Sequence, residues 1–215
     1  MLFTKNLTTH PLKPYGFANR CFYSFGRALV YCFLKIYCAF RREGPYLPEG
    51  PFIVAANHES FIDPPILQLA VGRRRVRFLM IESFYYTRLL NRFCNVMRCV
   101  AVKTESLNKT TMNLALEILE ARLPVAIFPQ GARMEPGDLG GASKGVAFLA
   151  RRAQVPVIPV RIRGTGRVLP KGAWFPRPRR VSVHVGDAIE FPQGEGEKVS
   201  LDEFKETIMS AIAAL

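Results

Sequence analysis

The chain has 215 residues, 49% of them apolar, which is enough to bury one sizeable domain with an appendage and too few for two full domains. Its net charge of +13 and pI near 9.9 predict an anionic partner, which can be nucleic acid, an anionic membrane surface or a phosphorylated substrate. Five cysteines without a C-x-x-C pair and three scattered histidines argue against a disulfide framework and a metal site, and favour a reducing compartment.

Residues 17–40 form an apolar segment with basic residues inside it. Its longest uncharged central stretch, Ala28–Leu34, is far short of the roughly 20 residues that a membrane span needs. Charges within the segment also argue against a signal peptide. The polar residues are spaced 4, 3, 4, 4 and 7 positions apart and so form one narrow helical stripe: Arg20, Ser24, Arg27, Tyr31, Lys35 and Arg42. This pattern predicts an amphipathic helix lying on an anionic membrane surface; a helix packed on its own core, with a solvated basic edge, stays open as the alternative.

Gly44-Pro45 and the turn at 48–50 mark a boundary after this helix. We therefore expect an N-terminal tail and membrane-associating helix over residues 1–44 and an α/β domain over residues 45–215. In the second part short apolar runs alternate with helical patterns. Strands are expected at 52–56, 76–80, 98–102, 125–128, 155–160 and 181–185, and helices at 84–94, 106–122, 144–154 and 201–215. The alternation predicts a mixed, largely parallel sheet flanked by helices.

Three residues with useful chemistry follow expected strands: His58, Lys103 and Gly131. Ligands of largely parallel sheets collect outside the carboxyl ends of the strands. We therefore expect these three residues to face one crevice.

The stretch NHESFIDPP, residues 57–65, places His58 five positions before Asp63. Asp63 and the proline after it predict a helix start, with the aspartate as N-cap. The short loop lets the Asp63 carboxylate meet one imidazole nitrogen, which fixes the tautomer and leaves the other nitrogen free to take a proton. A substrate hydroxyl is a better candidate nucleophile than Ser60, which lacks a G-x-S-x-G elbow. From these residues alone, a hydrogen-bonded core histidine beside a capping aspartate is the alternative.

Two further motifs follow expected strands. In FPQGAR, residues 128–133, Gly131 allows a tight turn whose amides approach a ligand, and Arg133 carries a planar fork suited to phosphate. VPVIPV, residues 155–160, contains Pro156 and Pro159. An interior strand would rarely tolerate proline, so we expect this motif to form an apolar wall.

In order and spacing these motifs resemble those of the glycerolipid acyltransferase family, which includes the 1-acylglycerol-3-phosphate acyltransferases. The family's pattern is NHxxxxD, G-x-I-x-x-x-R, FPEGTR and V-P-x-x-P. Residues 57–63 match the first element in full, and the similarity spans residues 45–190. The second element, at 97–103, has Met97 for glycine and Lys103 for arginine. In the third, Gln130 replaces glutamate, which excludes a base or metal ligand there, and Ala132 replaces threonine.

The resemblance implies transfer of an acyl chain from acyl-CoA or an acyl carrier protein to the free hydroxyl of a lysophospholipid, without an acyl-enzyme and without a further cofactor. Lysophosphatidate is the default acceptor and phosphatidic acid its product. The implied site residues are His58 and Asp63 for catalysis; Arg133, Lys103 and Gly131 for phosphate; Asn57, Gln130 and Pro129 as support; and Val155, Pro156 and Pro159 as the apolar wall. A backbone amide near Gly131 would stabilise the oxyanion. The resemblance also implies a membrane-associated protein at the cytoplasmic face of the inner or plasma membrane.

Other functions stay open. Glycerol 3-phosphate or another lysolipid would keep the mechanism, a hydrolase would use the same His-Asp pair with water, and a non-catalytic lipid-binding protein would explain the altered Gln130 and Ala132. The charge also suggests a nucleic-acid binder, through RRRVR at 73–77 and RPRR at 177–180. These stretches contain no interleaved aromatic platform and no recognisable binding module, so we expect no nucleic-acid partner.

Overall fold

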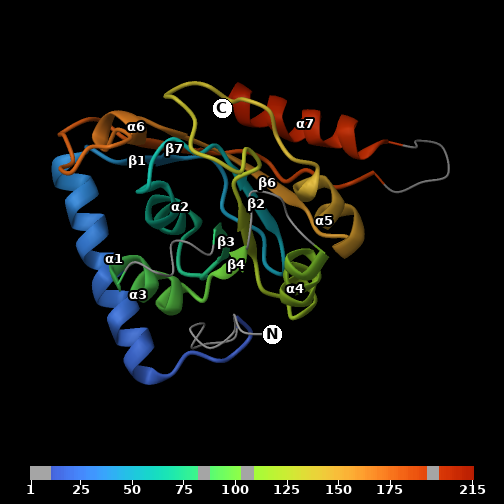
Figure 1. Ribbon diagram of the computed structural model, residues 1–215, viewed down its shortest axis with the longest axis horizontal. Coiled ribbons are helices and arrows are strands. Elements are labelled where there is room, and N and C mark those ends of the chain that lie inside the picture. The colour runs from blue at the N-terminus through green and yellow to red at the C-terminus, as the bar shows by residue number, and fades with distance from the viewer. Residues whose placement is uncertain (1–10, 82–87, 103–108, 193–198) are drawn as a thin grey trace.

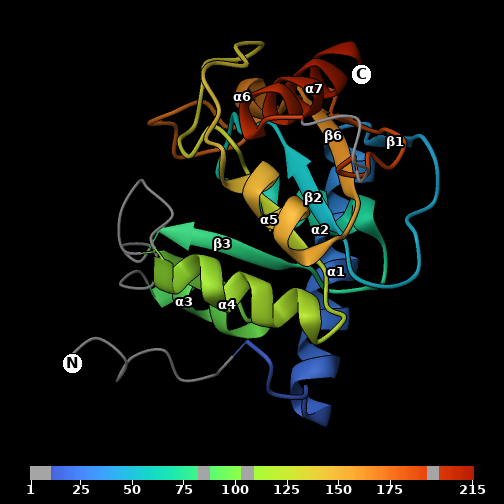
Figure 2. The same ribbon diagram turned by 90° about the vertical axis from the view of Figure 1, so that its right-hand side faces the viewer.

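The computed structural model describes residues 11–81, 88–102, 109–192 and 199–215, and its framework is one seven-stranded sheet (Figures 1 and 2). The strands lie in the order β1 (Arg41–Glu43), β7 (Ser182–Val185), β6 (Val157–Arg163), β2 (Ile53–Ala56), β5 (Val125–Ile127), β3 (Arg77–Ile81) and β4 (Val100–Val102). Neighbouring strands in this described sheet are parallel, except that β6 and β7 are antiparallel. The predicted mixed, largely parallel α/β fold is confirmed.

Helices cover both faces of the sheet (Figures 1 and 2). One face carries α1 (Phe17–Tyr37), α2 (Asp63–Val71) and α3 (Arg88–Met97); the other carries α4 (Lys109–Glu120), α5 (Gly145–Ala153) and α7 (Leu201–Ala214). Val54 of the central strand β2 packs in the core under α1–α3, whereas its neighbour Ile53 packs in the core under α4, α5 and α7. Burial on both faces explains why β2 reads as a continuous apolar run instead of an alternating one.

Most expected elements are present with bounds shifted by a few residues, as is usual at element ends. The sequence pattern missed two short ones, β1 and the single turn α6 (Thr165–Val168). Of the expected helices, the first part of 84–94 and the first residues of 106–122 lie outside the described residues.

Strand β6 is an interior strand between β2 and β7, so the expectation that its prolines exclude it from the sheet interior is wrong. Pro156 lies just before the strand, where its carbonyl accepts a hydrogen bond from Ile53 N at 2.9 Å. Pro156 contributes to the pairing with β2 only through this carbonyl, so its lack of an N–H removes no hydrogen bond to β2.

Pro159 is tolerated because it lies opposite a bulge. The flanking antiparallel pairs are Val160–Val185 and Val157–Ile189. Between these pairs β6 has two residues and the partner segment has three, so the ladder is interrupted there. The Pro159 carbonyl accepts from Gly186 N at 2.9 Å. Bulges are among the few interior positions where a strand accommodates proline.

The first 44 residues also contribute to the sheet, because β1 pairs in parallel with β7. Helix α1 packs on the domain through Leu34, the one buried residue of this helix, with Tyr23 and Val30 packed against the same core. The domain boundary near residue 45 stays a prediction. Among the described residues, no helix combines the length and apolarity that crossing a bilayer requires.

At Gly164, just after β6, the backbone lies close to the backbone of Arg180, just before β7. Gly164 has φ +92°, and a Cβ there would lie 2.1 Å from the carbonyl oxygen of Arg180. Gly172 has a similar φ of +83° with open space around it. Gly172→Ala should lower the free energy of unfolding by about 1–2 kcal/mol through backbone strain alone, and Gly164→Ala should lower it by more, because the two chain segments must also separate.

Urea denaturation followed by circular dichroism measures both changes. Equal losses in the two variants would show that the close approach at Gly164 does not exist in solution.

Candidate active site

The loops that follow β2 and β5 meet at the carboxyl ends of these neighbouring strands. His58 N donates to Gln130 Oε1 at 2.9 Å, and Met134 N donates to the His58 carbonyl at 2.8 Å. The loop after β5 therefore holds the backbone of His58 on both sides. This is the crevice position that ligands occupy in largely parallel sheets.

The carboxylate of Asp63 organises the loop after β2. Its Oδ2 accepts three hydrogen bonds: from His58 Nδ1 at 2.8 Å, from Glu59 N at 2.7 Å and from Ser60 N at 2.7 Å. Asp63 is fully buried. Because the carboxylate accepts here, the neutral imidazole has its proton on Nδ1 and its lone pair on Nε2. The predicted His58–Asp63 contact is present.

The start of α2 differs by one position from the prediction. Ile62 is the N-cap, without a side-chain cap, and Asp63 is the first helical residue, followed by a proline. The Asp63 carboxylate points back to the loop amides because these donors and the imidazole surround Oδ2. Asp63 thus stabilises the loop instead of capping the helix.

The His58 ring lies at the edge of an apolar cavity on the α1–α3 face. It stacks on Phe128, with ring centroids 4.3 Å apart, and its side chain is 16% exposed. The cavity has a volume of about 420 Å³. Apolar residues that line it include Phe22, Val30, Leu69, Phe93 and Val96. In the described part of the chain, His58 Nε2 has no hydrogen-bond partner, so a substrate hydroxyl can reach it.

Arg133 lies close to the same loop. Its guanidinium stacks 3.6 Å from the ring centre of Phe61, which also lines the apolar cavity. Burial lowers the pKa of Arg133, and the charge of Asp63 opposes that shift. An arginine in this setting stays charged and keeps its planar fork for a phosphate. Lys103, the other expected phosphate ligand, lies outside the described residues.

Gly131 allows the tight turn after β5, but its own N–H already donates a hydrogen bond within the protein. It has φ +70°, and its N–H donates to the Phe128 carbonyl at 3.0 Å. Among the described residues, the next two amides, of Ala132 and Arg133, donate to no protein group. These two are therefore better placed than Gly131 itself to bind a substrate oxygen.

Asn57 ties the site to β6. Its Oδ1 accepts from Ile162 N at 2.7 Å and its Nδ2 donates to the Ile162 carbonyl at 2.8 Å. Pro129 supports the neighbouring loop through its carbonyl, which accepts from Ser143 N at 2.8 Å. Both residues hold backbone in place and neither lines the cavity beside His58.

The expected apolar wall does not lie beside His58. Val155 packs in the core under α4, α5 and α7, on the other face of the sheet, and Pro159 faces the bulge. None of Val155, Pro156 and Pro159 lines the cavity. Most of its apolar residues come from α1, α2 and α3 instead, and the signal for α1 was the helical period of residues 17–40.

The acyltransferase family model matches residues 40–163, more than half of the chain. The chain belongs to the acyltransferase family. It is 35% identical to the 1-acyl-sn-glycerol-3-phosphate acyltransferase of Pseudomonas aeruginosa over 164 residues. This alignment covers 71% of this chain and 59% of that protein. The chain is 27% identical over 127 residues to the chloroplastic 1-acyl-sn-glycerol-3-phosphate acyltransferase BAT2 of Brassica napus, covering 58% of this chain.

The fold is also similar to a solved structure. The crystal structure of the 1-acyl-sn-glycerophosphate acyltransferase PlsC from Thermotoga maritima matches with a TM-score of 0.70 and 23% identity, over 86% of this chain and 73% of that one. The chain spans 36% of the Brassica napus protein and 59% of the Pseudomonas aeruginosa protein. The resemblance to this family that the motifs indicate is confirmed.

Gln130 departs from the glutamate of the family's FPEGTR pattern, and its contacts explain how an amide fits. While Oε1 accepts from His58 N, Nε2 donates to the Asp138 carbonyl at 3.3 Å. A carboxylate could accept the first bond but could not donate the second. The substitution therefore keeps the His58 backbone in place without a charge.

Glu59 is a buried acid next to His58 that is not among the site residues expected from the motifs. It is 7% exposed, and its Oε1 accepts from Gly137 N at 3.2 Å and from Asn57 Nδ2 at 3.3 Å. Burial raises the pKa of Glu59, and the nearby Asp63 charge adds to the shift. In the described ranges, no three His, Cys, Asp or Glu side chains gather to hold a metal ion.

The raised pKa of Glu59 makes a prediction about stability. The folded protein binds a proton at Glu59 at a higher pH than the unfolded chain does, so ionised Glu59 lowers stability at neutral pH. This loss of stability disappears as the pH falls through the raised pKa of Glu59 in the folded protein towards its ordinary pKa of 4.5. Glu59→Gln should therefore be more stable than the wild type at pH 7, by a margin that shrinks at acid pH.

Chemical denaturation at several pH values measures the margin, with Glu117→Gln, an exposed position on α4, as the control. A margin that stays constant between pH 7 and pH 4.5 would contradict the buried, proton-binding state of Glu59.

Proposed function

We propose that this protein transfers an acyl chain from an acyl thioester to the free hydroxyl of a lysophospholipid, with 1-acylglycerol 3-phosphate as acceptor and phosphatidic acid as product. The carrying observation is the imidazole of His58, with Nδ1 bonded to the buried Asp63 and Nε2 open beside an apolar cavity. Membership of the acyltransferase family and the activity named for its relatives support the same reaction.

In this mechanism His58 is the general base. Nε2 removes the proton of the acceptor hydroxyl, and the resulting oxygen attacks the thioester carbonyl. The C–S bond then breaks, and the thiolate leaves and takes up the proton from His58. The mechanism needs no acyl-enzyme. Ser60, a serine two residues after His58, is buried, and its Oγ donates to the Leu169 carbonyl at 2.9 Å.

During the attack negative charge develops on the carbonyl oxygen of the thioester, and a hydrogen-bond donor would stabilise it. The amides of Ala132 and Arg133 are unpaired within the described chain and follow the tight turn at Gly131. One well-placed donor of this kind contributes roughly 3–4 kcal/mol to such a transition state. No cofactor beyond the thioester is required by these steps.

The phosphate of the acceptor and the acyl chain each have a suitable surface near His58. Arg133, held flat against Phe61, would bind the acceptor phosphate, and Lys103 is proposed as its helper. The apolar cavity of about 420 Å³ would take an acyl chain. Its position under α1 lets a lipid enter from the side of that helix.

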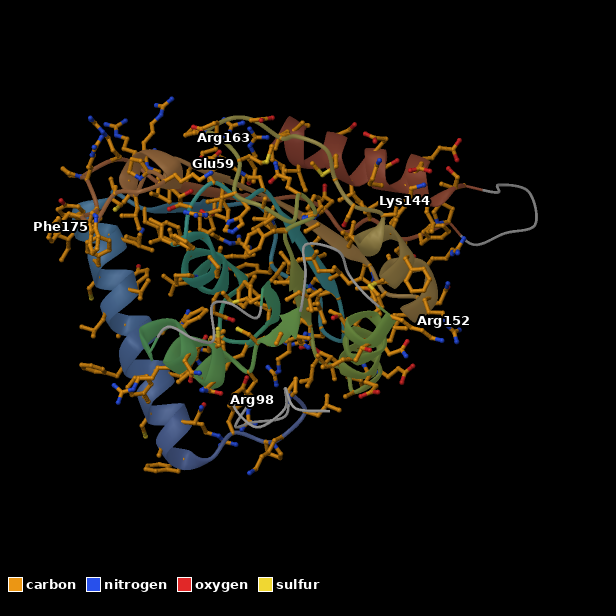
Figure 3. All side chains as sticks on the ribbon, viewed as in Figure 1. Glu59, Arg98, Lys144, Arg152, Arg163 and Phe175 are labelled. Atoms are coloured by element: carbon orange, nitrogen blue, oxygen red, sulfur yellow. The ribbon has the colours of Figure 1, made fainter. Side chains whose placement is uncertain are left out.

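We further propose that α1 lies on an anionic membrane surface. Large apolar side chains of this helix are exposed: Phe17, Phe22, Phe25, Leu29, Phe33 and Ile36. Trp174 and Phe175 are also exposed, and Phe175 lies at the end of α1 (Figure 3). There the Tyr37 hydroxyl donates to the Pro176 carbonyl at 3.1 Å. Exposed aromatic residues beside cationic ones favour a lipid interface. Five free cysteines favour the cytoplasmic face of the inner or plasma membrane.

Acyl transfer is tested by mass spectrometry of the products after incubation with acyl-CoA, or acyl carrier protein, and a panel of lysolipids in mixed micelles. We expect phosphatidic acid from lysophosphatidate, and a roughly 10²–10⁴-fold lower rate for His58→Ala, because the base is lost. Circular dichroism and liposome binding of the variant should stay unchanged. Release of free fatty acid without an acylated lysolipid would replace the proposal by hydrolysis, and intact thioester with every acceptor would refute it.

Arg133→Ala tests the assignment of the acceptor phosphate. Loss of a charged hydrogen-bond donor should raise the KM for lysophosphatidate by roughly ten-fold or more and leave the KM for the donor nearly unchanged. Steady-state kinetics with each substrate varied in turn measures both constants. Equal changes in the two KM values would contradict this role.

A further inference from the structure

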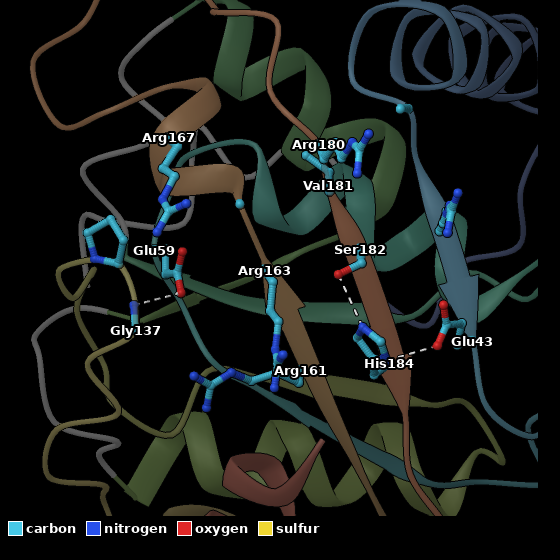
Figure 4. Close-up of a pocket in the computed structure, with 14 residues that line it drawn as sticks. Glu43, Glu59, Gly137, Arg161, Arg163, Arg167, Arg180, Val181, Ser182 and His184 are labelled. Carbon is cyan, nitrogen blue, oxygen red and sulfur yellow. Dashed lines mark hydrogen bonds and ion pairs between the residues drawn. The ribbon is translucent and has the colours of Figure 1, made fainter.

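A second cavity, of about 570 Å³, is lined by Glu59, the neighbour of His58 in the sequence, and is rich in arginine (Figure 4). It is bounded by β1, β6, β7 and the segment that begins α6. The arginines that line it are Arg41, Arg161, Arg163, Arg167 and Arg180; we call it the arginine pocket. Two acids, Glu43 and Glu59, face five guanidinium groups there, so positive charge is in excess.

Arg161 carries unused donors into this pocket. It is only 9% exposed, and its Nε and Nη1 are buried without a hydrogen-bond partner. Burying an unpaired charged donor is unfavourable, and Arg163, on the same face of β6, adds repulsion. Both effects disappear when an anion fills the pocket.

The acids do not neutralise these donors. Glu43 lies 3.4 Å from His184 Nδ1, and the other ring nitrogen of His184 is 3.1 Å from Ser182 Oγ. Glu59 attracts Arg161 but already accepts hydrogen bonds from Gly137 and Asn57. The pocket therefore suits a ligand with several negative oxygens.

The pocket opens on the face of the sheet away from α1. Ile162 and Val183 pack in the core under α1–α3, so their neighbours Arg161, Arg163 and Ser182 point to the other face. A lipid surface against α1 is therefore on the far side of the sheet. A water-soluble anion fits this position better than a lipid headgroup does.

The arginine pocket is connected to the reaction site. A small cavity of about 90 Å³ shares Glu59 with the pocket and also contacts Arg133. Arg133 in turn packs on Phe61, which lines the apolar cavity together with His58. Glu59, Arg133 and Phe61 thus join the arginine pocket to the cavity that His58 lines, and we expect a long, flexible arm to follow this route.

We propose that the arginine pocket binds the phosphorylated nucleotide of acyl-CoA, namely its 3′-phosphate and diphosphate, while the pantetheine arm carries the thioester to His58. This inference rests on the proposed function and names coenzyme A as the carrier of the acyl donor. Arginine forks bind phosphate oxygens in pairs, which matches several arginines around two phosphorylated groups. Arg133 stays with the acceptor phosphate, so the two substrates use separate cations.

Calorimetric titration of the full chain with coenzyme A, without acyl donor or acceptor, tests binding. Arg163→Gln and Arg161→Met should each weaken it at least ten-fold, and Glu59→Gln should tighten it, because one negative charge leaves the pocket. The control is Arg152→Gln on α5, which lies far from Glu59 and Arg163 (Figure 3) and should change nothing. Unchanged affinity in both arginine variants would overturn the proposal.

Binding of other phosphate-containing ligands shows whether the pocket recognises the nucleotide of coenzyme A, a simpler phosphate or a lipid headgroup. Binding of 4′-phosphopantetheine or of inorganic phosphate as tightly as coenzyme A would overturn the role of the nucleotide. Loss of binding to phosphatidate vesicles by Arg163→Gln, with coenzyme A binding unchanged, would assign the pocket to a lipid headgroup instead.

Kinetics separates this inference from the proposed function. In Arg163→Gln, the KM for acyl-CoA should rise about ten-fold, while the KM values for acyl-phosphopantetheine and lysophosphatidate stay unchanged. Equal increases for both donors would overturn the proposal although acyl transfer stands. Coenzyme A binding that depends on Arg161, in a protein that acylates no lysolipid, would instead support the pocket and refute the proposed function.

Discussion

The buried carboxylate of Asp63 is the constraint on which the candidate site depends. A carboxylate without solvent needs donors, and Asp63 obtains them by drawing two loop amides and the His58 imidazole onto one oxygen. The same contacts set the shape of the loop, the tautomer of the imidazole and the entry into α2. Because His58 Nδ1 is used in this way, Nε2 is the nitrogen that remains for chemistry.

The central position of β2 supplies the rest of the framework. Its two neighbours in the sheet, β5 and β6, each hold one residue of the Asn57-His58 pair: β5 through the loop at Gln130 and β6 through the backbone of Ile162. Alternation along β6 then places Arg161 and Arg163 on the face opposite the α1–α3 core. One strand thus anchors the loop that carries His58 and supplies two arginines of the arginine pocket.

The local features of the site were predictable where they depend on short-range chemistry. Five residues between His58 and Asp63 suffice for their contact, and the strand-helix alternation suffices for the fold class. The position of Pro159 was not predictable, because a bulge depends on the register of a partner strand distant in sequence. The arginine pocket was not predictable for the same reason: its arginines come from β1, β6, α6 and the segment before β7, and no stretch of sequence contains them together.

The distribution of positive charge has a physical reason in the proposed reaction. Both substrates are polyanions, and their phosphates repel each other as the hydroxyl approaches the thioester. In the proposed reaction separate cations, Arg133 for the lysolipid and the arginine pocket for coenzyme A, would balance each charge where it lies. With the apolar cavity on the side of α1 and the arginine pocket on the other face, the proposed reaction would bring the lipid from the membrane and the donor from water. His58, at the carboxyl end of the central strand, lies where these two paths meet.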